Sequence, residues 1–387
     1  MPLLVVLACA CFVASLSVRV VDPVIPEIAR ELTVAPATVA MLASAFAVPY
    51  ALSQPLLGPL GDTIGKALII KVCLAVLAAA LIASALAPNI EMLFAARIVA
   101  GAAGGGLIPV ALAVVGDRFA IEERQVALSR VLGAMLTAVL VGAIGSGMIA
   151  DLFGWRVVLV IAAALTAAAL WIALVNLKPR ADRARQKFSL ERILTGYRTV
   201  FQNPRAKICF SAVFIEGVIV FGFLPYIAIL LEQRGAGGIR EAGFVLAGMG
   251  AGGVLYTVAV PVLLRRLGGM FNLMRVGGAL VALGFAGVAA GGPWLLEAMA
   301  FVLVGFGFYA IHNSLQTQAT ELAPENRGSA VSLHAFFFFL GHAAGPPVYA
   351  LAFATAGAFA TLAAVVVVTP LLAMLLARLL EPRPVTG

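Results

Sequence analysis

The sequence has few charged residues and few cysteines. Asp, Glu, Lys and Arg make up only 11% of its 387 residues, whereas 63% are hydrophobic and the mean hydropathy is +1.07. A soluble domain has about a quarter of its residues charged, so this composition excludes that class and predicts a protein that crosses a membrane many times. The four cysteines lie inside apolar runs and have neither metal-site nor disulfide spacing. Because the sequence also lacks a nucleophile pattern, we expect neither an enzyme nor a bound cofactor or metal.

Long apolar runs fill most of the sequence. A helix rises about 1.5 Å per residue, so about 20 apolar residues cross a hydrocarbon core about 30 Å thick. We predict an all-α membrane protein with an N-terminal six-helix bundle at 1–177, a cytoplasmic basic linker at 178–205 and a C-terminal six-helix bundle at 206–387. The 12 predicted transmembrane helices span 3–27, 36–57, 67–87, 91–115, 127–150, 155–177, 206–231, 241–264, 271–290, 293–320, 329–354 and 357–380.

The second half of the sequence matches the first when it is shifted by 203 residues. Any single match is weak in a chain with 39 glycines, but together the matches fall in equivalent loops and helices. They indicate two parallel repeats and hence two pseudo-symmetric bundles. The matched pairs are Gly65 and Gly268, Glu122 and Glu325, Arg124 and Arg327, Gly142 and Gly345, and Gly154 and Gly357.

Positive charges gather on one side of the predicted membrane. With a cytoplasmic N-terminus, 20 of the 26 Lys and Arg residues fall in inside segments and only five fall outside. Because cytoplasmic loops carry an excess of Lys and Arg, we expect both termini in the cytoplasm and the protein in the plasma (inner) membrane. The net charge of +8 therefore reflects topology and contact with the lipid bilayer, and we expect no nucleic-acid partner.

A short charged turn follows the second apolar run and reads Gly58-Pro-Leu-Gly-Asp62-Thr-Ile-Gly65-Lys66. Its pattern resembles the loop between helices 2 and 3 of the major facilitator superfamily, a large family of secondary transporters. The resemblance implies the major facilitator fold, in which two bundles surround a central cavity that opens alternately to each side. It also implies a latch, in which Asp62 contacts the positive start of helix 11, near Ser329, and closes the cytoplasmic side.

Arg118, at the inner end of helix 4, would join this latch by the same resemblance. Thr63 stands where the family commonly has a basic residue, and Ala67 follows Lys66, so we expect a weaker latch than in other members. A plain solvated turn, in which the glycines serve only to reverse the chain, is the alternative.

Helix 4 contains Arg97 followed by Gly101, a pair that resembles the helix-4 motif of the superfamily, although Ala100 replaces its usual polar residue. An arginine several residues inside the membrane needs a partner or a wet cavity. Arg97 therefore either faces the central cavity or extends to the outer interface.

The first helix ends Arg19-Val-Val-Asp22-Pro-Val-Ile-Pro26, which resembles the same point in the drug and metabolite exporters of the superfamily. Arg19, Asp22 and Arg97 lie at a similar predicted depth. Because a buried charge is stable only when paired, we infer an ion pair between Asp22 and an arginine. An acid in ordinary water at the interface is the alternative.

Helix 5 carries Gly133, Gly142 and Gly147. Their arrangement resembles a motif of the antiporter branch, with Ala143 in place of the usual proline. Glycines at these positions would thin the helix so that it packs against its counterpart across the interface between the halves. Generic close packing of small residues, which carries no information on transport direction, is the alternative.

The second half has its own polar residues inside apolar runs. Glu216 lies near the middle of helix 7, where an ionised carboxylate is costly, so it either carries a proton during part of a transport cycle or donates a permanent hydrogen bond. His342, in the middle of helix 11, either titrates or donates one hydrogen bond. His312, Asn313 and Gln316 share helix 10 at helical spacing and would form a polar recognition face.

These observations together predict a proton-coupled antiporter that exports a small organic molecule. Protonation of Glu216 or Asp22 would alternate with substrate binding, and the proton gradient would supply the energy. We expect a monomer whose partners are the substrate, protons and lipid. An importer or facilitated-diffusion carrier remains open, as does a non-transporting membrane sensor or assembly protein. The polar and aromatic side chains fit amphipathic drugs, sugars and amino-acid derivatives equally.

Overall fold

The computed structural model describes residues 3–178 and 190–381, and within these ranges the chain is helical and contains no strand. The first half contains α1 (Leu3–Arg19), η1 (Asp22–Val24), α2 (Ile25–Glu31), α3 (Pro36–Ile64), α4 (Lys66–Ala85), α5 (Ile90–Arg118), α6 (Ile121–Phe153) and α7 (Trp155–Asn176). The rest contains α8 (Leu190–Gln202), α9 (Arg205–Glu216), the π-helix η2 (Gly217–Phe221), η3 (Leu224–Tyr226), α10 (Ile227–Gln233), α11 (Ile239–Leu267), α12 (Met270–Ala290), α13 (Trp294–Glu321), η4 (Pro324–Asn326) and α14 (Arg327–Leu380).

Twelve helical spans cross the molecule, as the apolar runs predict. Eleven described stretches are long and apolar enough to cross a membrane, and the last of them, 324–380, contains two spans. Its backbone leaves helical geometry at Gly357 (φ 79°, ψ 162°), where helix 11 ends and helix 12 begins. Only glycine adopts such a positive φ without strain, so this residue reverses the chain between the two spans.

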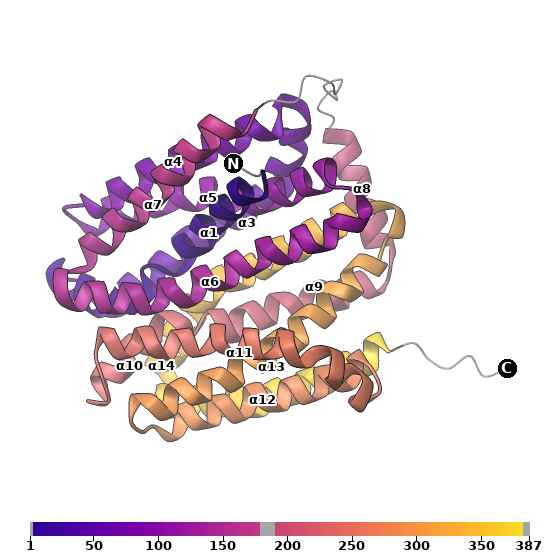
Figure 1. Ribbon diagram of the computed structural model, residues 1–387. Helices are drawn as coiled ribbons and strands as arrows, with labels where there is room; N and C mark the ends of the chain where they lie inside the picture. Colours follow the sequence, from indigo (N-terminus) through magenta and orange to yellow (C-terminus); the bar gives the residue numbers. More distant parts are fainter. Residues whose placement is uncertain (1–2, 179–189, 382–387) are drawn as a thin grey trace.

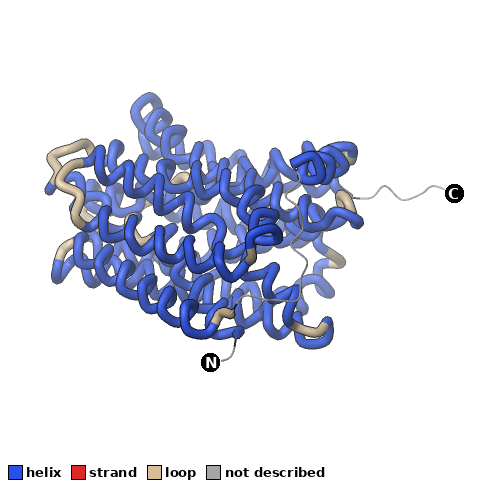
Figure 2. Tube along the Cα trace, turned by 90° about the horizontal axis from the view of Figure 1, so that it is seen from above, coloured by secondary structure: helices blue, strands red, loops and turns tan. Residues whose placement is uncertain are grey.

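The spans lie side by side with their loops at the two ends of the molecule (Figure 2). In Figure 1 the helices of the first half form the upper group and those of the second half form the lower group. Contacts between the halves run mainly from α3 to α14 and from α6 to α11. The helix α8 lies at one end, which we call the linker end, and α10 lies at the opposite end (Figure 1), where it contacts α2.

The first helix of each half is broken at an equivalent place. The first span consists of α1, η1 and α2, and Pro23 begins the break. The seventh span consists of α9, η2, η3 and α10, and Pro225 occupies the same position in its 3-10 turn. Proline has no amide hydrogen to donate to the preceding turn, so it weakens the helix at each site. The same device in both halves agrees with the repeat seen in the sequence.

The halves touch at the end opposite the linker end through glycines of α6 and α11. A β-carbon on Gly147 would lie 2.6 Å from the carbonyl oxygen of Ile239, and one on Gly243 would lie 2.6 Å from that of Ala143. Arg30 and Glu232 form an ion pair of 2.6 Å across the same end. Residues without side chains let the two backbones meet, so this end is closed.

The predicted helix 5 is α6, and its counterpart in the repeat, helix 11, is the first part of α14. The prediction that these two helices pack together was wrong about the partner. Gly147 meets α11, whereas the repeat copy of the motif, Gly345 in α14, packs against Gly222 beside η2. Gly142 faces Leu16 of α1, in its own half, and nothing lies within 4 Å of a β-carbon on Gly133. Of the three predicted motif glycines, only Gly147 therefore lies at the contact between the halves.

We expect Gly147→Ala to open this end, because the added methyl group needs the space of the Ile239 carbonyl oxygen. Spin labels in place of the exposed residues Ala35 and Gln233, measured by double electron–electron resonance, should then show longer distances. Gly133→Ala is the matched control in the same helix and should leave the distances unchanged. Equal distance distributions for both variants would mean that the glycine contact does not hold the end closed.

Candidate functional site

A first polar cluster lies at the break of the first span. α1 ends at Arg19, and the turn before Pro23 places Asp22 back against it, with 3.0 Å between Arg19 Nη1 and Asp22 Oδ2. Asp22 is only 2% exposed and Arg19 only 7%. The predicted pairing of Asp22 with an arginine is therefore present, with Arg19 as the partner. The alternative of a water-exposed interfacial acid was wrong.

Arg97 of α5 joins this cluster from the neighbouring helix. Its Nη1 donates a hydrogen bond of 3.1 Å to the carbonyl oxygen of Ser17, and its guanidinium carbon lies 4.2 Å from the centre of the Phe46 ring. It lies close enough to Asp22 for their charges to interact. Because Arg97 is 1% exposed, it does not extend to the outer interface. The cation–π contact and the carbonyl satisfy part of its charge inside the protein.

The second half completes the cluster. His342 of α14 places Nε2 at 3.3 Å from Arg19 Nη1, and the Phe221 ring at the end of η2 lies 4.4 Å from the Arg19 guanidinium carbon. An arginine always donates, so His342 accepts at Nε2 and is the neutral form. Arg19 is thus held between an acid of its own half and a histidine and an aromatic ring of the other half.

A second polar cluster lies inside the second half. His312 Nδ1 and Glu216 Oε2 are 2.9 Å apart, and the ring of His334 meets the ring of His312 edge to face at 4.9 Å. Phe308 and Phe338 pack on the His312 ring at 4.9 and 4.8 Å. Glu216 is 6% exposed, so it shares one hydrogen bond with a histidine in apolar surroundings.

The π-helix η2 connects the two clusters. Glu216 immediately precedes it, and Phe221, which covers Arg19, is its last residue. Gly217 at its start packs tightly on α14, since a β-carbon there would lie 2.5 Å from the Phe338 carbonyl oxygen. Short π-helical segments are uncommon and occur mostly at functional sites. η2 therefore joins the two clusters within one short segment of the chain.

Among the three residues of the predicted recognition face on helix 10, His312 has a buried partner, and the face itself stays a prediction. His312 contacts Glu216, whereas Gln316, one turn further along, is exposed. Asn313 is half-buried and its carbonyl oxygen accepts from Thr317. α9 and α14 both pack on α13, and Glu216 of α9 and His334 of α14 contact His312.

The predicted charged turn is mostly helix. α3 continues to Ile64, seven residues beyond the predicted end, because its last turns pack on α5, where a β-carbon on Gly61 would lie 3.7 Å from Val110. Gly65 alone makes the turn, with φ 107°. Lys66 Nζ then forms an ion pair of 2.7 Å with Asp117 Oδ2 at the end of α5.

The other predicted latch residues are Gly58, Asp62 and Arg118. Arg118 follows Asp117 and is exposed. Gly58 lies within α3, and the side chain of Asp62 lies outside the part of the chain that the structure describes, so its contact near Ser329 stays a prediction. A β-carbon on Gly196 of α8 would lie 2.7 Å from Ser329 Oγ, so α8 covers the start of α14.

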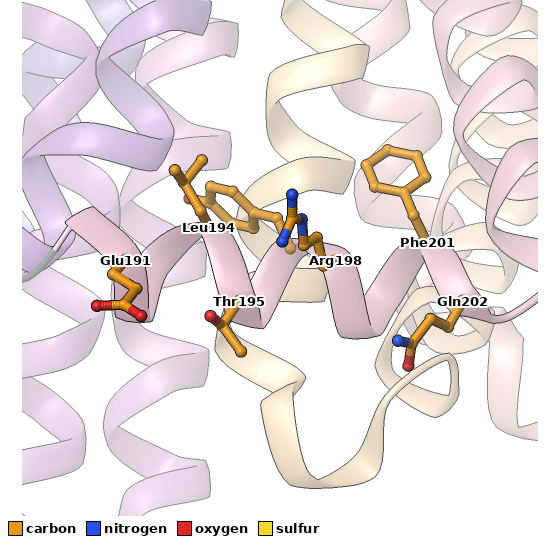
Figure 3. A pocket seen from close by; sticks show the side chains of 7 residues that line it. Glu191, Leu194, Thr195, Arg198, Phe201 and Gln202 are labelled. Carbon is orange, nitrogen blue, oxygen red and sulfur yellow. The ribbon is translucent and has the colours of Figure 1, made fainter.

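A large open pocket of about 810 Å³ runs along α8 and is distinct from the buried clusters. Figure 3 shows Leu194, Arg198 and Phe201 on one side of this helix and Thr195 and Gln202 on the other. Its lining comes from α8 alone, so it is a surface groove at the linker end. We therefore place the functional site at the buried clusters, where both halves supply the charged groups.

Comparison with known proteins agrees with this architecture. The family model described as Major Facilitator Superfamily matches residues 7–346. The chain belongs to the major facilitator superfamily. This is a superfamily of transporters, whose members bind small-molecule substrates within the membrane, so the chain is a multi-pass membrane transporter.

Individual members of the superfamily align over most of the chain. An uncharacterized MFS-type transporter of Bacillus subtilis, YwfA, is 25% identical over 90% of this chain and 86% of its own length. Multidrug resistance protein 1 of the same organism is 22% identical over 87% and 85%. The crystal structure of the nucleoside transporter NupG matches with a TM-score of 0.76 and 18% identity, over 98% of this chain and 99% of NupG. This structural likeness shows the shared fold.

Two residues of this superfamily member were missed by sequence reasoning. His334 is 1% exposed and extends the Glu216–His312 contact. Phe221 covers Arg19 from the other half. His334 precedes His342 by eight residues, about two turns of the same predicted helix, and this spacing was the available signal. Phe221 is one of 23 phenylalanines, and nothing in the sequence distinguishes it from the others.

Proposed function

We propose that the chain is a proton-coupled antiporter that exports a small organic molecule. The observation that carries this proposal is the buried contact between Glu216 and His312. One proton shared by these two side chains neutralises the carboxylate, and its loss leaves a charge in apolar surroundings. Substrate binding and proton binding would then alternate at this pair, with η2 transmitting the change to Arg19 and Asp22.

Several features support export across the plasma (inner) membrane with both termini in the cytoplasm. The excess of Lys and Arg on the linker side supports this orientation. The helix-5 glycines resemble an antiporter motif, and one relative is named a multidrug resistance protein. In the proposal the chain works as a monomer, uses the proton gradient as its energy source and needs no cofactor.

The test uses the purified protein in liposomes that contain a pH-sensitive dye. A pH gradient is imposed, and candidate solutes are added one at a time. We expect proton flux that depends on the solute and runs opposite to it. Solute movement without proton flux would instead establish facilitated diffusion. Solutes that stabilise the protein but never cross the membrane would establish a sensor.

A further inference from the structure

The cluster around Arg19 carries an excess of positive charge. Arg19 and Arg97 each carry one positive charge, Asp22 carries one negative charge, and His342 is neutral because it accepts a hydrogen bond from Arg19. All four side chains are at least nine-tenths buried. A buried charge without a counter-charge is costly, so this cluster is one anion short.

Three nitrogen atoms of the cluster are buried and have no hydrogen-bond partner within the described chain: Arg19 Nη2, Arg97 Nε and His342 Nδ1. The two arginine atoms belong to the groups that carry the positive charge. A buried guanidinium donor without an acceptor is unfavourable, because it has lost its water and gained nothing in return. Each arginine thus has an N–H group that can donate a hydrogen bond to a carboxylate oxygen.

A cavity of about 50 Å³ lies beside Arg19 between the two halves. Val139 and Ala143 of α6 line it from the first half, and Phe221, Leu246, Met249 and Tyr309 are among its lining residues from the second half. Its walls are therefore apolar and aromatic around one arginine. A guanidinium group binds a carboxylate through strong charge-assisted hydrogen bonds, and apolar walls suit a hydrophobic body.

We propose that this cavity binds the carboxylate of a hydrophobic organic anion, with Arg19 as its principal partner and the rings of Phe221 and Tyr309 against its apolar body. This inference rests on the proposed transport function and names its substrate class. A volume of about 50 Å³ holds the head group only, since whole ligands occupy about 300–1,000 Å³. The rest of the molecule enters when the halves separate, so anion binding and the position of Phe221 are linked.

Binding to the purified full-length protein tests the inference with three matched probes. Phenylacetate carries a negative charge, phenylacetamide is neutral, and phenethylamine carries a positive charge. We expect phenylacetate to raise the thermal unfolding midpoint and to bind in a radioligand assay, and we expect the other two to do neither. Stabilisation by phenethylamine with no effect of phenylacetate would overturn the inference.

Two variants locate the anion at the cluster. Arg19→Gln removes the principal donor and should weaken phenylacetate binding about tenfold or more, as expected for loss of a charge-assisted hydrogen bond. Asp22→Asn removes the competing acid, so it should bind phenylacetate more tightly than the unmodified protein. These opposite changes distinguish the inference from a general loss of folding, which would weaken phenylacetate binding in both variants. Wild-type affinity in Arg19→Gln, or weakened binding in Asp22→Asn, would contradict the inference.

The binding measurements can fail or succeed independently of the transport proposal. Anion binding that follows these rules, together with an absence of proton flux in liposomes, would leave the anion site and remove the antiport mechanism. Proton-coupled export of phenethylamine-like cations without anion binding would do the reverse.

Discussion

Replacing Glu216 with glutamine should reduce transport driven by a pH gradient to the level of empty liposomes. Glutamine keeps the size of the side chain and can still hydrogen-bond His312, which lies 2.9 Å from the carboxylate, but it cannot take up or release a proton. Exchange of substrate across the membrane without a gradient should continue, because it needs no proton. The measurement compares gradient-driven flux with substrate exchange in the same liposomes.

Glu297→Gln is the matched control. Glu297 is also buried in the second half, at 2% exposed, but it forms an ion pair of 3.0 Å with Arg234. A carboxylate with a cation partner stays ionised, so its loss should lower stability without changing the dependence of flux on the gradient. If Glu216→Gln retained that dependence, Glu216 would have a structural role and would be removed from the coupling mechanism.

The second large effect is expected from Gly101→Ala in α5. A β-carbon on Gly101 would overlap the carbonyl oxygen of Phe46 in α3. The helices must then separate, which also withdraws the Phe46 ring from Arg97. Overpacking of this kind costs about 1–3 kcal/mol. We therefore expect a clear fall in the unfolding midpoint of the purified protein, together with loss of transport.

Gly116→Ala serves as its control in the same helix. Nothing lies within 4 Å of a β-carbon on Gly116, and alanine favours the helix over glycine by about 1 kcal/mol. The midpoint of this variant should therefore stay the same or rise. Equal destabilisation by both substitutions would mean that α5 tolerates no alanine for reasons unrelated to its contact with α3.

Features that depend on short stretches of chain were predictable. Each span must satisfy its backbone hydrogen bonds internally in lipid, so its apolar length is visible in the sequence, and all twelve spans were found. The Arg19–Asp22 pair was predictable for a related reason. The two residues are three positions apart, at a helix end marked by proline.

The end of α3 shows where this local reasoning failed. The glycines and proline around Gly58 indicated a loop, yet packing against α5 keeps these residues helical as far as Ile64. Local signals for a turn were overridden because a long neighbouring helix offered contacts along the whole length. Long-range packing also explains why Gly147 contacts α11 and not the predicted counterpart helix.

The sequence by itself determined the membrane class, the twelve spans, the repeat and the presence of buried charges, because each follows from composition and local spacing. Only the tertiary structure decided which buried groups meet. Glu216 contacts His312, which is 96 residues away in the sequence, and Arg19 contacts His342, which is 323 residues away. No periodicity encodes such pairs, since they arise when whole helices pack. These pairs also determine what the buried groups can do, because the energetic cost of a buried charge depends on its partner.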